Sequence, residues 1–422
     1  MLTNAEMALA KRKAAHPLPA RTREVRLDVA QRLGVDVDDL PPDSDRAEPL
    51  LHILLESVPE PVRGLIKARQ VVVGEVSAPG PGAHVYSEGG GFVVVLHSEL
   101  FEFLFRIVRA FSSALFRAEG SEPQHGIELP RLARVIAEIF FWYERYNIVF
   151  GSDYDITIDQ IKLGGLITRD AELFLLAHEL SHVIVAVGRS DGRLRQELSA
   201  TDEESFADAI AVQLLMSSVA QPVHGFRLAL CMAGVEVALQ IWRILAMLGV
   251  SVESGVHPPS ETRLGVIRGA CRRFFPDEQS YEAAAQIADV FEKVFDRVAE
   301  IILNPAEQAA VYAAEAADLI DRIHRLIGEC SAGESPDYFR FMHEMSVLLD
   351  EGYPEMVIEK VFNTYGRALF DPSTKDLPAT EQKKIFFGYK LLFRLTQETN
   401  DPAFDVLHQE LTKFSGAAQM PI

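Results

Sequence analysis

Two histidines four residues apart, with a glutamate directly after the first, occur in the stretch LLAHELSHVI at residues 175–184. In a helix, His178 and His182 would lie on one face, because side chains at i and i+4 point the same way. Neutral imidazoles at this spacing suit a zinc ion, and Glu179 would lie beside a water in the ion's open coordination position. A carboxylate there can accept a proton from that water, which is the chemistry of zinc-dependent hydrolysis.

A third ligand is available in the next predicted helix, TDEESFADAIAVQLL, where Glu204 and Asp208 are four residues apart. Helical spacing puts both carboxylates on one face. The pattern is similar to that of gluzincins, in which such a glutamate is the third zinc ligand. Asp208 would then accept a hydrogen bond from the far nitrogen of a ligand histidine. Glu203 is the rival ligand, but its i+4 partner is Ala207, which carries no carboxylate.

Alternatives to a metal site stay open for these residues. The segment around His178 and His182 is apolar nearly all round, which is also typical of a buried core helix with two hydrogen-bonded histidines. Glu204 could instead complete a capping box with Thr201 at the start of its helix. Such a capping box would not explain why Asp208 lies on the inward face.

Together these motifs resemble those of the HtpX and CAAX-processing metallopeptidases. HELSH and EESFAD are similar to that family's H-E-x-x-H and E-x-x-A-D motifs, AHVYSEGGGFVVVLHSEL to its glycine hairpin, and VHPPSETRL to its H-P-P-x-x-x-R-L segment. The resemblance covers residues 84–270. It implies zinc bound by His178, His182 and Glu204. The chain departs from the family in the long stretch between hairpin and zinc helix, and in lacking the family's membrane spans.

The same resemblance implies roles for residues beyond the zinc ligands. Glu179 would be the general base, and His257 would stabilise the oxyanion. An extended peptide substrate would lie along the glycine-hairpin strand, which we expect at the edge of the sheet. The substrate-binding residues would be Gly90, Gly91, Phe92 and Val93. We expect Arg263, in the same segment as His257, to form a structural ion pair with a nearby carboxylate.

The sequence patterns along the chain predict the elements that position these residues. They indicate a mainly α fold with a small β-sheet (α+β). We expect a zincin-like metallopeptidase core with an additional C-terminal helical region. The expected parts are an N-terminal helical segment at 1–69, the metallopeptidase domain at 70–276 and a C-terminal helical domain at 277–422. QVVVGEV predicts a strand, the glycine-rich stretch a hairpin, and DITIDQI one more strand or a turn. The zinc helix is predicted to start with Asp170 as N-cap and to end before Gly188.

Composition argues against several classes of protein. The net charge of −20 disfavours nucleic-acid binding, which needs a basic surface. The three widely spaced cysteines form neither a disulfide framework nor a cysteine metal site, which suits a reducing cytoplasm. The apolar run at 228–242 holds Glu236 and is shorter than the ~20 residues of a membrane span. We therefore expect a core helix there, and a soluble, cytoplasmic, bacterial protein.

The predicted function is a zinc endopeptidase that acts on a protein or peptide substrate, without a nucleic-acid partner or a membrane span. The C-terminal helices could bind a regulatory partner or form a homo-oligomer. Two other functions stay open: a catalytically silent zinc-binding scaffold, and a helical interaction protein without a metal. Glu179 disfavours the silent scaffold, because a structural zinc site needs no base.

Overall fold

The chain divides into two compact units, Met1–Asn304 and Pro305–Ile422. The structure, a computed structural model, describes residues 2–17, 45–78, 80–115, 129–146, 149, 157–194, 198–219, 225–249, 258–308 and single positions or short pieces between 321 and 388. Elements α1 to α11 lie in the first unit. The three-part division expected from the sequence stays a prediction.

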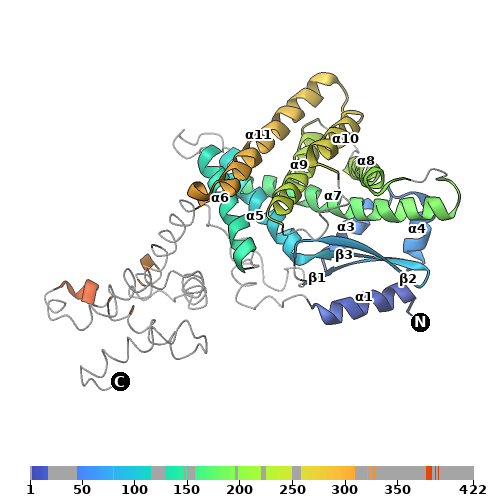
Figure 1. Ribbon diagram of the computed structural model, residues 1–422, viewed down its shortest axis with the longest axis horizontal. Helices are drawn as coiled ribbons and strands as arrows, with labels where there is room; N and C mark the ends of the chain where they lie inside the picture. The colour runs from blue at the N-terminus through green and yellow to red at the C-terminus, as the bar shows by residue number, and fades with distance from the viewer. Residues whose placement is uncertain are drawn as a thin grey trace, which may run out of the picture. The chain divides into compact units, whose positions relative to one another are not determined.

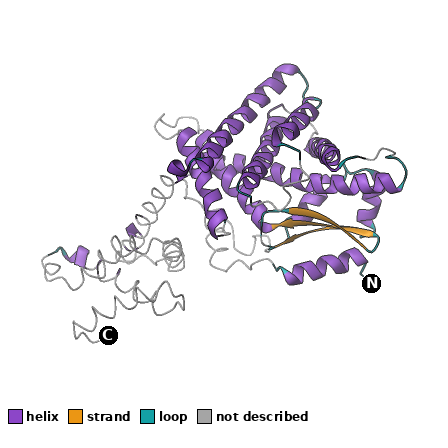
Figure 2. Ribbon diagram, in the orientation of Figure 1, coloured by secondary structure: helices purple, strands orange, loops and turns teal. Residues whose placement is uncertain are grey.

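The first unit is mainly helical with one small sheet, as the sequence predicts (Figure 2). Its helices are α1 (Asn4–Ala15), α3 (Ala47–Leu54), α4 (Glu60–Lys67), α5 (Ser98–Leu115), α6 (Leu129–Tyr146), α7 (Ile158–Ser190), α8 (Ala200–Val219), α9 (Gly225–Met247), α10 (Ser260–Arg272) and α11 (Glu278–Leu303). Its strands are β1 (Val71–Val76), β2 (Ala83–Glu88) and β3 (Gly91–His97). The predicted strand in QVVVGEV and the predicted glycine hairpin are therefore confirmed.

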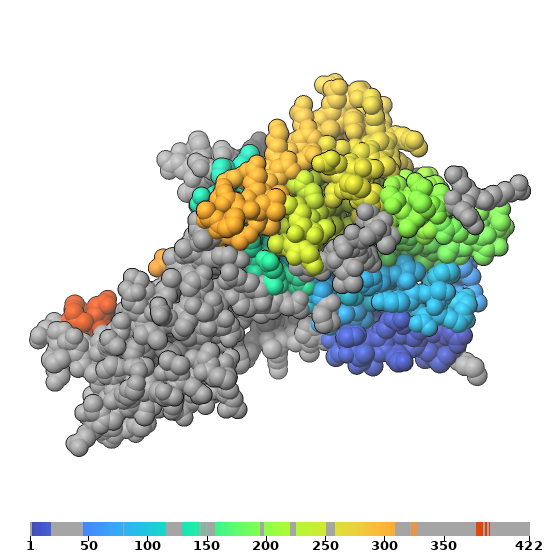
Figure 3. Space-filling model, in the orientation of Figure 1, coloured from blue at the N-terminus to red at the C-terminus, as the bar shows by residue number. Residues whose placement is uncertain are grey.

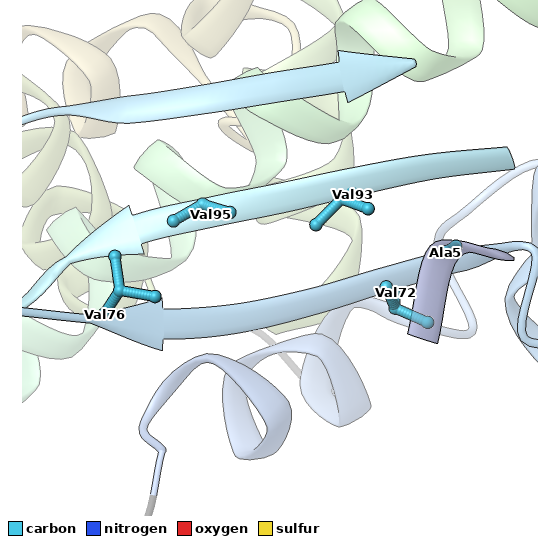
Figure 4. Packing of buried hydrophobic residues seen from close by; sticks show 5 residues of the cluster. All are labelled: Ala5, Val72, Val76, Val93 and Val95. Carbon is cyan, nitrogen blue, oxygen red and sulfur yellow. The ribbon is translucent and has the colours of Figure 1, made fainter. Parts of the chain in front are cut away.

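The sheet has the strand order β1-β3-β2, with β1 parallel and β2 antiparallel to β3. Gly89 and Gly90 make the tight turn of the hairpin at φ 55° and 86°, a backbone conformation that favours glycine. Side chains alternate between the two faces of a strand, and one face packs against α1. The residues of this small core, drawn in Figure 4, are Ala5, Val72, Val76, Val93 and Val95. The other face of the hairpin packs against α7 (Figure 1).

Helix α7 lies at the centre of the first unit and packs against α5, α8, α9 and the sheet. It begins with a capping box, in which Thr157 Oγ1 accepts from Gln160 N (3.3 Å) and Gln160 Oε1 accepts from Thr157 N (2.8 Å). The expectation of a strand or turn in DITIDQI is therefore wrong from Ile158 onward. Gly164, which weakens a helix prediction, is tolerated because it packs against α5, where a Cβ would lie 2.5 Å from Ser112 Oγ.

The predicted ends of the zinc helix are also wrong. Asp170 is fully buried in the middle of α7 and accepts hydrogen bonds from Arg227 of α9, one of them at 2.6 Å. It joins two helices instead of capping one. Gly188 lies within α7, which continues to Ser190.

Helix α9 is the buried core helix that the sequence predicts at 228–242. By length and composition, α7 and α9 could each cross a membrane, but 67% and 89% of their apolar stretches are buried inside the fold. The core helix of a soluble protein can be equally long and apolar, so two such helices are weak support for a membrane span. Gly234 lets the two helices approach closely, since a Cβ there would lie 2.8 Å from the carbonyl oxygen of Ile167.

Charged groups from the start of α3, from β1 and from α7 lie close together. The Arg46 guanidinium binds the buried carboxylate of Glu75, with Nη2 2.7 Å from Oε1. Glu172 of α7 lies within electrostatic range of both. Burial, followed by the charge of Glu75, raises the pKa of Glu172 to about 7, although Arg46 acts in the opposite direction.

Replacing Gly234 by alanine is expected to lower the free energy of unfolding by about 1–3 kcal/mol, because the new methyl group meets backbone atoms of α7 that cannot move aside. Gly165→Ala on the exposed side of α7 is the matched control, since its Cβ meets nothing within 4 Å. It should leave stability unchanged or raise it by up to ~1 kcal/mol. Denaturant titration measures both, and equal effects of the two changes would contradict the close packing of α7 and α9.

Glu172 should make stability depend on pH. A carboxyl whose pKa is raised from 4.5 to about 7 by folding stabilises the protein below pH 4.5, and this contribution is lost as the pH rises through 7. The loss is on the order of 3 kcal/mol. Unfolding of wild type and Glu172→Gln across pH 4–8 should show a steeper decline in stability in the wild type than in the variant. Parallel curves would show that folding does not raise the pKa of the Glu172 carboxyl group.

Candidate metal centre

His178, Glu179 and His182 lie in the second half of α7, where the helix is enclosed by its neighbours. His178 and Glu179 are buried, and His182 is partly exposed. One turn of helix separates the two histidines, and their Nε2 atoms lie 3.3 Å apart. The two imidazoles therefore face the same point in space, as the four-residue spacing predicts.

Helix α8 packs against α7 and brings the buried carboxylate of Glu204 to these nitrogens. Glu204 Oε2 lies 3.3 Å from His178 Nε2, and Oε1 lies 3.4 Å from His182 Nε2. Among the described residues, these three form a group whose ligand atoms could hold one metal ion.

The separations fit the dimensions of a zinc site. With tetrahedral bonds of about 2.0–2.1 Å, neighbouring ligand atoms lie about 3.3–3.4 Å apart. The two Nε2 atoms lie at this separation, and each of them lies at this separation from one of the two Glu204 oxygens. Two imidazoles and one carboxylate are also a donor set that zinc accepts in catalytic sites, where a fourth position is left for water. The residues present therefore fit a zinc ion.

The start of α8 removes one alternative for Glu204. The cap is made by Ser199, whose Oγ accepts from Asp202 N (3.1 Å) and donates to Asp202 Oδ2 (2.7 Å). A capping box of Thr201 with Glu204 is therefore not formed, and the Glu204 carboxylate faces the histidines.

Asp208, one turn beyond Glu204 on α8, lies on the far side of His178. Its Oδ1 is 3.0 Å from His178 Nδ1, a distance suited to an ion pair but without the alignment of a hydrogen bond. Arg263 of α10 donates two hydrogen bonds of 2.8 Å to the same carboxylate. This is the ion pair expected for Arg263, and both groups are buried. Trp242 of α9 contacts the His178 ring edge-to-face and lies under the Arg263 guanidinium.

These contacts set the charges in the metal-free protein. Burial alone would raise the pKa of Asp208, but the hydrogen bonds from Arg263, followed by the ion pair with His178, hold it below its ordinary value. Burial alone would lower the pKa of His178, but Asp208 and Glu204 together raise it to about 10. A proton on the Nε2 of His178 and a metal ion would therefore compete for one lone pair, so metal binding releases a proton.

Glu203 is a residue whose position the sequence did not predict. Its Oε1 lies 3.4 Å from His182 Nδ1, and its Oε2 lies 2.6 Å from Arg189 Nη2 of α7. One sequence feature could have indicated a charged partner near His182. Arg189 follows His182 by seven residues, which puts both on one face of the helix. No short-range sequence pattern predicted that the packing of α8 on α7 would bring Glu203 to that face.

A cavity of about 410 Å³ opens beside the histidines, between the hairpin and the α7–α8 pair. Figure 3 shows the atoms of the hairpin region in light blue next to those of α7 and α8 in green. Glu179, Glu203 and Glu204 line it from the helices. The residues that line it from β2 and β3 are Ala83, His84, Val85, Tyr86, Ser87 and Phe92.

The expected substrate strand needs correction. Gly91, Phe92 and Val93 lie in β3, the central strand, which pairs with β1 on one side and β2 on the other. The edge strand beside the cavity is β2, because β1 pairs with the other side of β3. No local sequence pattern indicates this pairing of β1 with β3. Phe92 lines the cavity, whereas Val93 packs toward α1 (Figure 4) and Gly90 lies in the hairpin turn.

His257 lies outside the described residues, so its role at an oxyanion stays a prediction. The described chain resumes at the buried Pro258, and Pro259 is the N-cap residue of α10.

Purified chain should carry about one zinc per molecule. His178→Ala and Glu204→Ala should each lose most of it, because each removes one ligand atom from the group. Zinc content by mass spectrometry after dialysis is the measurement, with His52→Ala, an exposed histidine of α3, as the control that keeps the metal. Full zinc occupancy in the His178→Ala, His182→Ala double variant would rule out this site.

Comparison with known proteins gives one family. Residues 157–287 match the model of the family described as Peptidase U49. The match spans α7 to α10 and the beginning of α11. It includes His178, Glu179, His182 and Glu204, whereas the hairpin lies before it. No curated protein and no solved structure matches the chain. The matched stretch is thus similar to a peptidase family, and it contains the one candidate metal group of the described residues.

Proposed function

We propose that this chain is a zinc-dependent endopeptidase, with His178, His182 and Glu204 as the zinc ligands. The observation that carries the proposal is the meeting of two imidazole nitrogens and a carboxylate at separations of 3.3–3.4 Å beside a cavity. The match to Peptidase U49 supports the reaction class. Three protein ligands with one open position are typical of catalytic zinc sites, whereas structural sites are closed.

Zinc bound there would polarise the scissile carbonyl and lower the pKa of a water in its open position. Glu179 handles the protons: its carboxylate lines the cavity one residue along α7 from His178. It accepts a proton as the water attacks and delivers it to the departing amine. Water attacks directly, so no covalent intermediate with the chain forms. Asp208, kept ionised by Arg263, orients His178 through its Nδ1 atom.

The substrate we propose is an extended protein or peptide segment along the outer side of β2. Among the described strands, β2 pairs only with β3, so it is an edge strand of the sheet and borders the cavity. Adding a strand to a sheet edge fixes a peptide through main-chain hydrogen bonds. Apolar contacts from Val85 and Phe92 in the cavity wall would accompany them.

The finer assignments rest on the sequence. A gluzincin-type site related to the HtpX and CAAX-processing peptidases is supported by the order of the motifs and by the placing of Glu204 and Asp208 on one face of α8. A cytoplasmic location is supported by the three cysteines in the sequence, of which Cys231 and Cys271 are free and buried.

Glu179→Gln should keep the zinc and the fold but lower turnover by a factor on the order of 10² or more, because the amide cannot accept the proton. The readouts are zinc content, circular dichroism and cleavage of a quenched-fluorescent peptide library. Glu282→Gln, on the exposed face of α11, is the matched control. If the wild type cleaves the library and Glu179→Gln cleaves it equally fast, Glu179 is not the base.

A further inference from the structure

The two histidines of the centre have the same kind of support on their outer nitrogens, supplied by different residues. His178 Nδ1 faces Asp208, whose carboxylate is held by Arg263. His182 Nδ1 faces Glu203, whose carboxylate is held by Arg189. Each imidazole thus has a carboxylate at Nδ1 and an arginine behind that carboxylate.

Glu203 and Arg189 reach His182 because of the directions in which their side chains leave α8 and α7. Arg189 lies two turns after His182 on α7, on the same face. Glu203 and Glu204 are successive residues of α8, so their side chains diverge by about 100° around the helix. Glu204 reaches the Nε2 side of His182 and Glu203 reaches its Nδ1 side, at 3.4 Å each.

We propose that Glu203, fixed by Arg189, is a positioning residue for His182. Its carboxylate accepts a hydrogen bond from the Nδ1–H group, which selects the tautomer with a free lone pair on Nε2 and turns that lone pair toward Glu204 and His178. The inference rests on the proposed metal centre. It gives Glu203 a role other than that of the alternative ligand to Glu204.

The two supports differ in exposure. The side chains of Arg263 and Asp208 are 5% and 0% exposed, whereas those of Arg189 and Glu203 are 39% and 24% exposed. Salt screens exposed pairs much more than buried ones. The contribution of Glu203 to metal affinity should therefore fall as salt rises, and that of Asp208 should not.

The test is the zinc dissociation constant, measured by competition with a chelator at about 0.05 M and about 1 M salt. At low salt, Glu203→Ala should weaken binding by about 10-fold, and Glu203→Gln by less, because the amide oxygen still accepts a hydrogen bond. Arg189→Ala should act through the same carboxylate, so the double variant should bind as weakly as Glu203→Ala alone. At high salt the effect of Glu203→Ala should shrink, while Asp208→Ala should stay equally damaging.

Glu282→Ala is the matched control, since it removes the same charge from the exposed face of α11. Thermal unfolding of the metal-free variants separates a loss of positioning from a loss of fold, and we expect unchanged midpoints for Glu203→Ala. A wild type that binds zinc together with a Glu203→Ala variant that binds it equally well overturns this proposal alone. Additive effects of Glu203→Ala and Arg189→Ala also overturn it. A wild type that binds no zinc overturns the metal centre and this proposal together.

Discussion

The contact of α8 with α7 forces ionisable groups into the interior, and the rest of the centre follows from it. Glu179, Glu204 and Asp208 are buried. Arg263, which is buried too, interacts electrostatically with all three carboxylates. Unpaired buried charge is costly, so such groups survive only with partners or with a bound metal. Three carboxylates facing one guanidinium leave an excess of two negative charges, which a divalent cation would balance. The raised pKa of His178 supplies one positive charge when no metal is bound.

The scaffold around α7 explains how the groups keep their places. Gly234 lets α9 lie close to α7, and Arg227 of α9 binds the buried Asp170. On the opposite side the hairpin is held by α1, where Asn4 Nδ2 donates to the carbonyl oxygen of Gly89 at 3.0 Å and the guanidinium of Arg12 lies 4.0 Å from the ring centre of Tyr86. The cavity thus lies between two supported walls, one helical and one stranded.

Features set by local spacing could be predicted from the sequence. The i and i+4 positions of His178 and His182 predicted their shared face, and the turn glycines predicted the hairpin. Glu204 and Asp208 could be placed on one face of α8 for the same reason. The alternation of isoleucines around residue 158 was misleading, because an exposed first turn of helix carries no burial pattern to contradict it.

The remaining features depend on partners far along the chain. Asp170 is paired with Arg227, 57 residues away, so its burial could not be read from its own helix. The central place of β3 depends on where β1 inserts, and this moved the expected substrate edge to β2. Glu203 acquired its contact with His182 only through the way α8 packs on α7.

The central claim is that two imidazoles and one carboxylate bind a single zinc ion. Anomalous diffraction at the zinc absorption edge from crystals of the zinc-loaded chain tests it most directly. The account predicts one strong peak about 2.0–2.2 Å from His178 Nε2, His182 Nε2 and a carboxylate oxygen of Glu204. Zinc-loaded crystals that show no peak within bonding distance of these three atoms, or a peak bound by other residues, would contradict it.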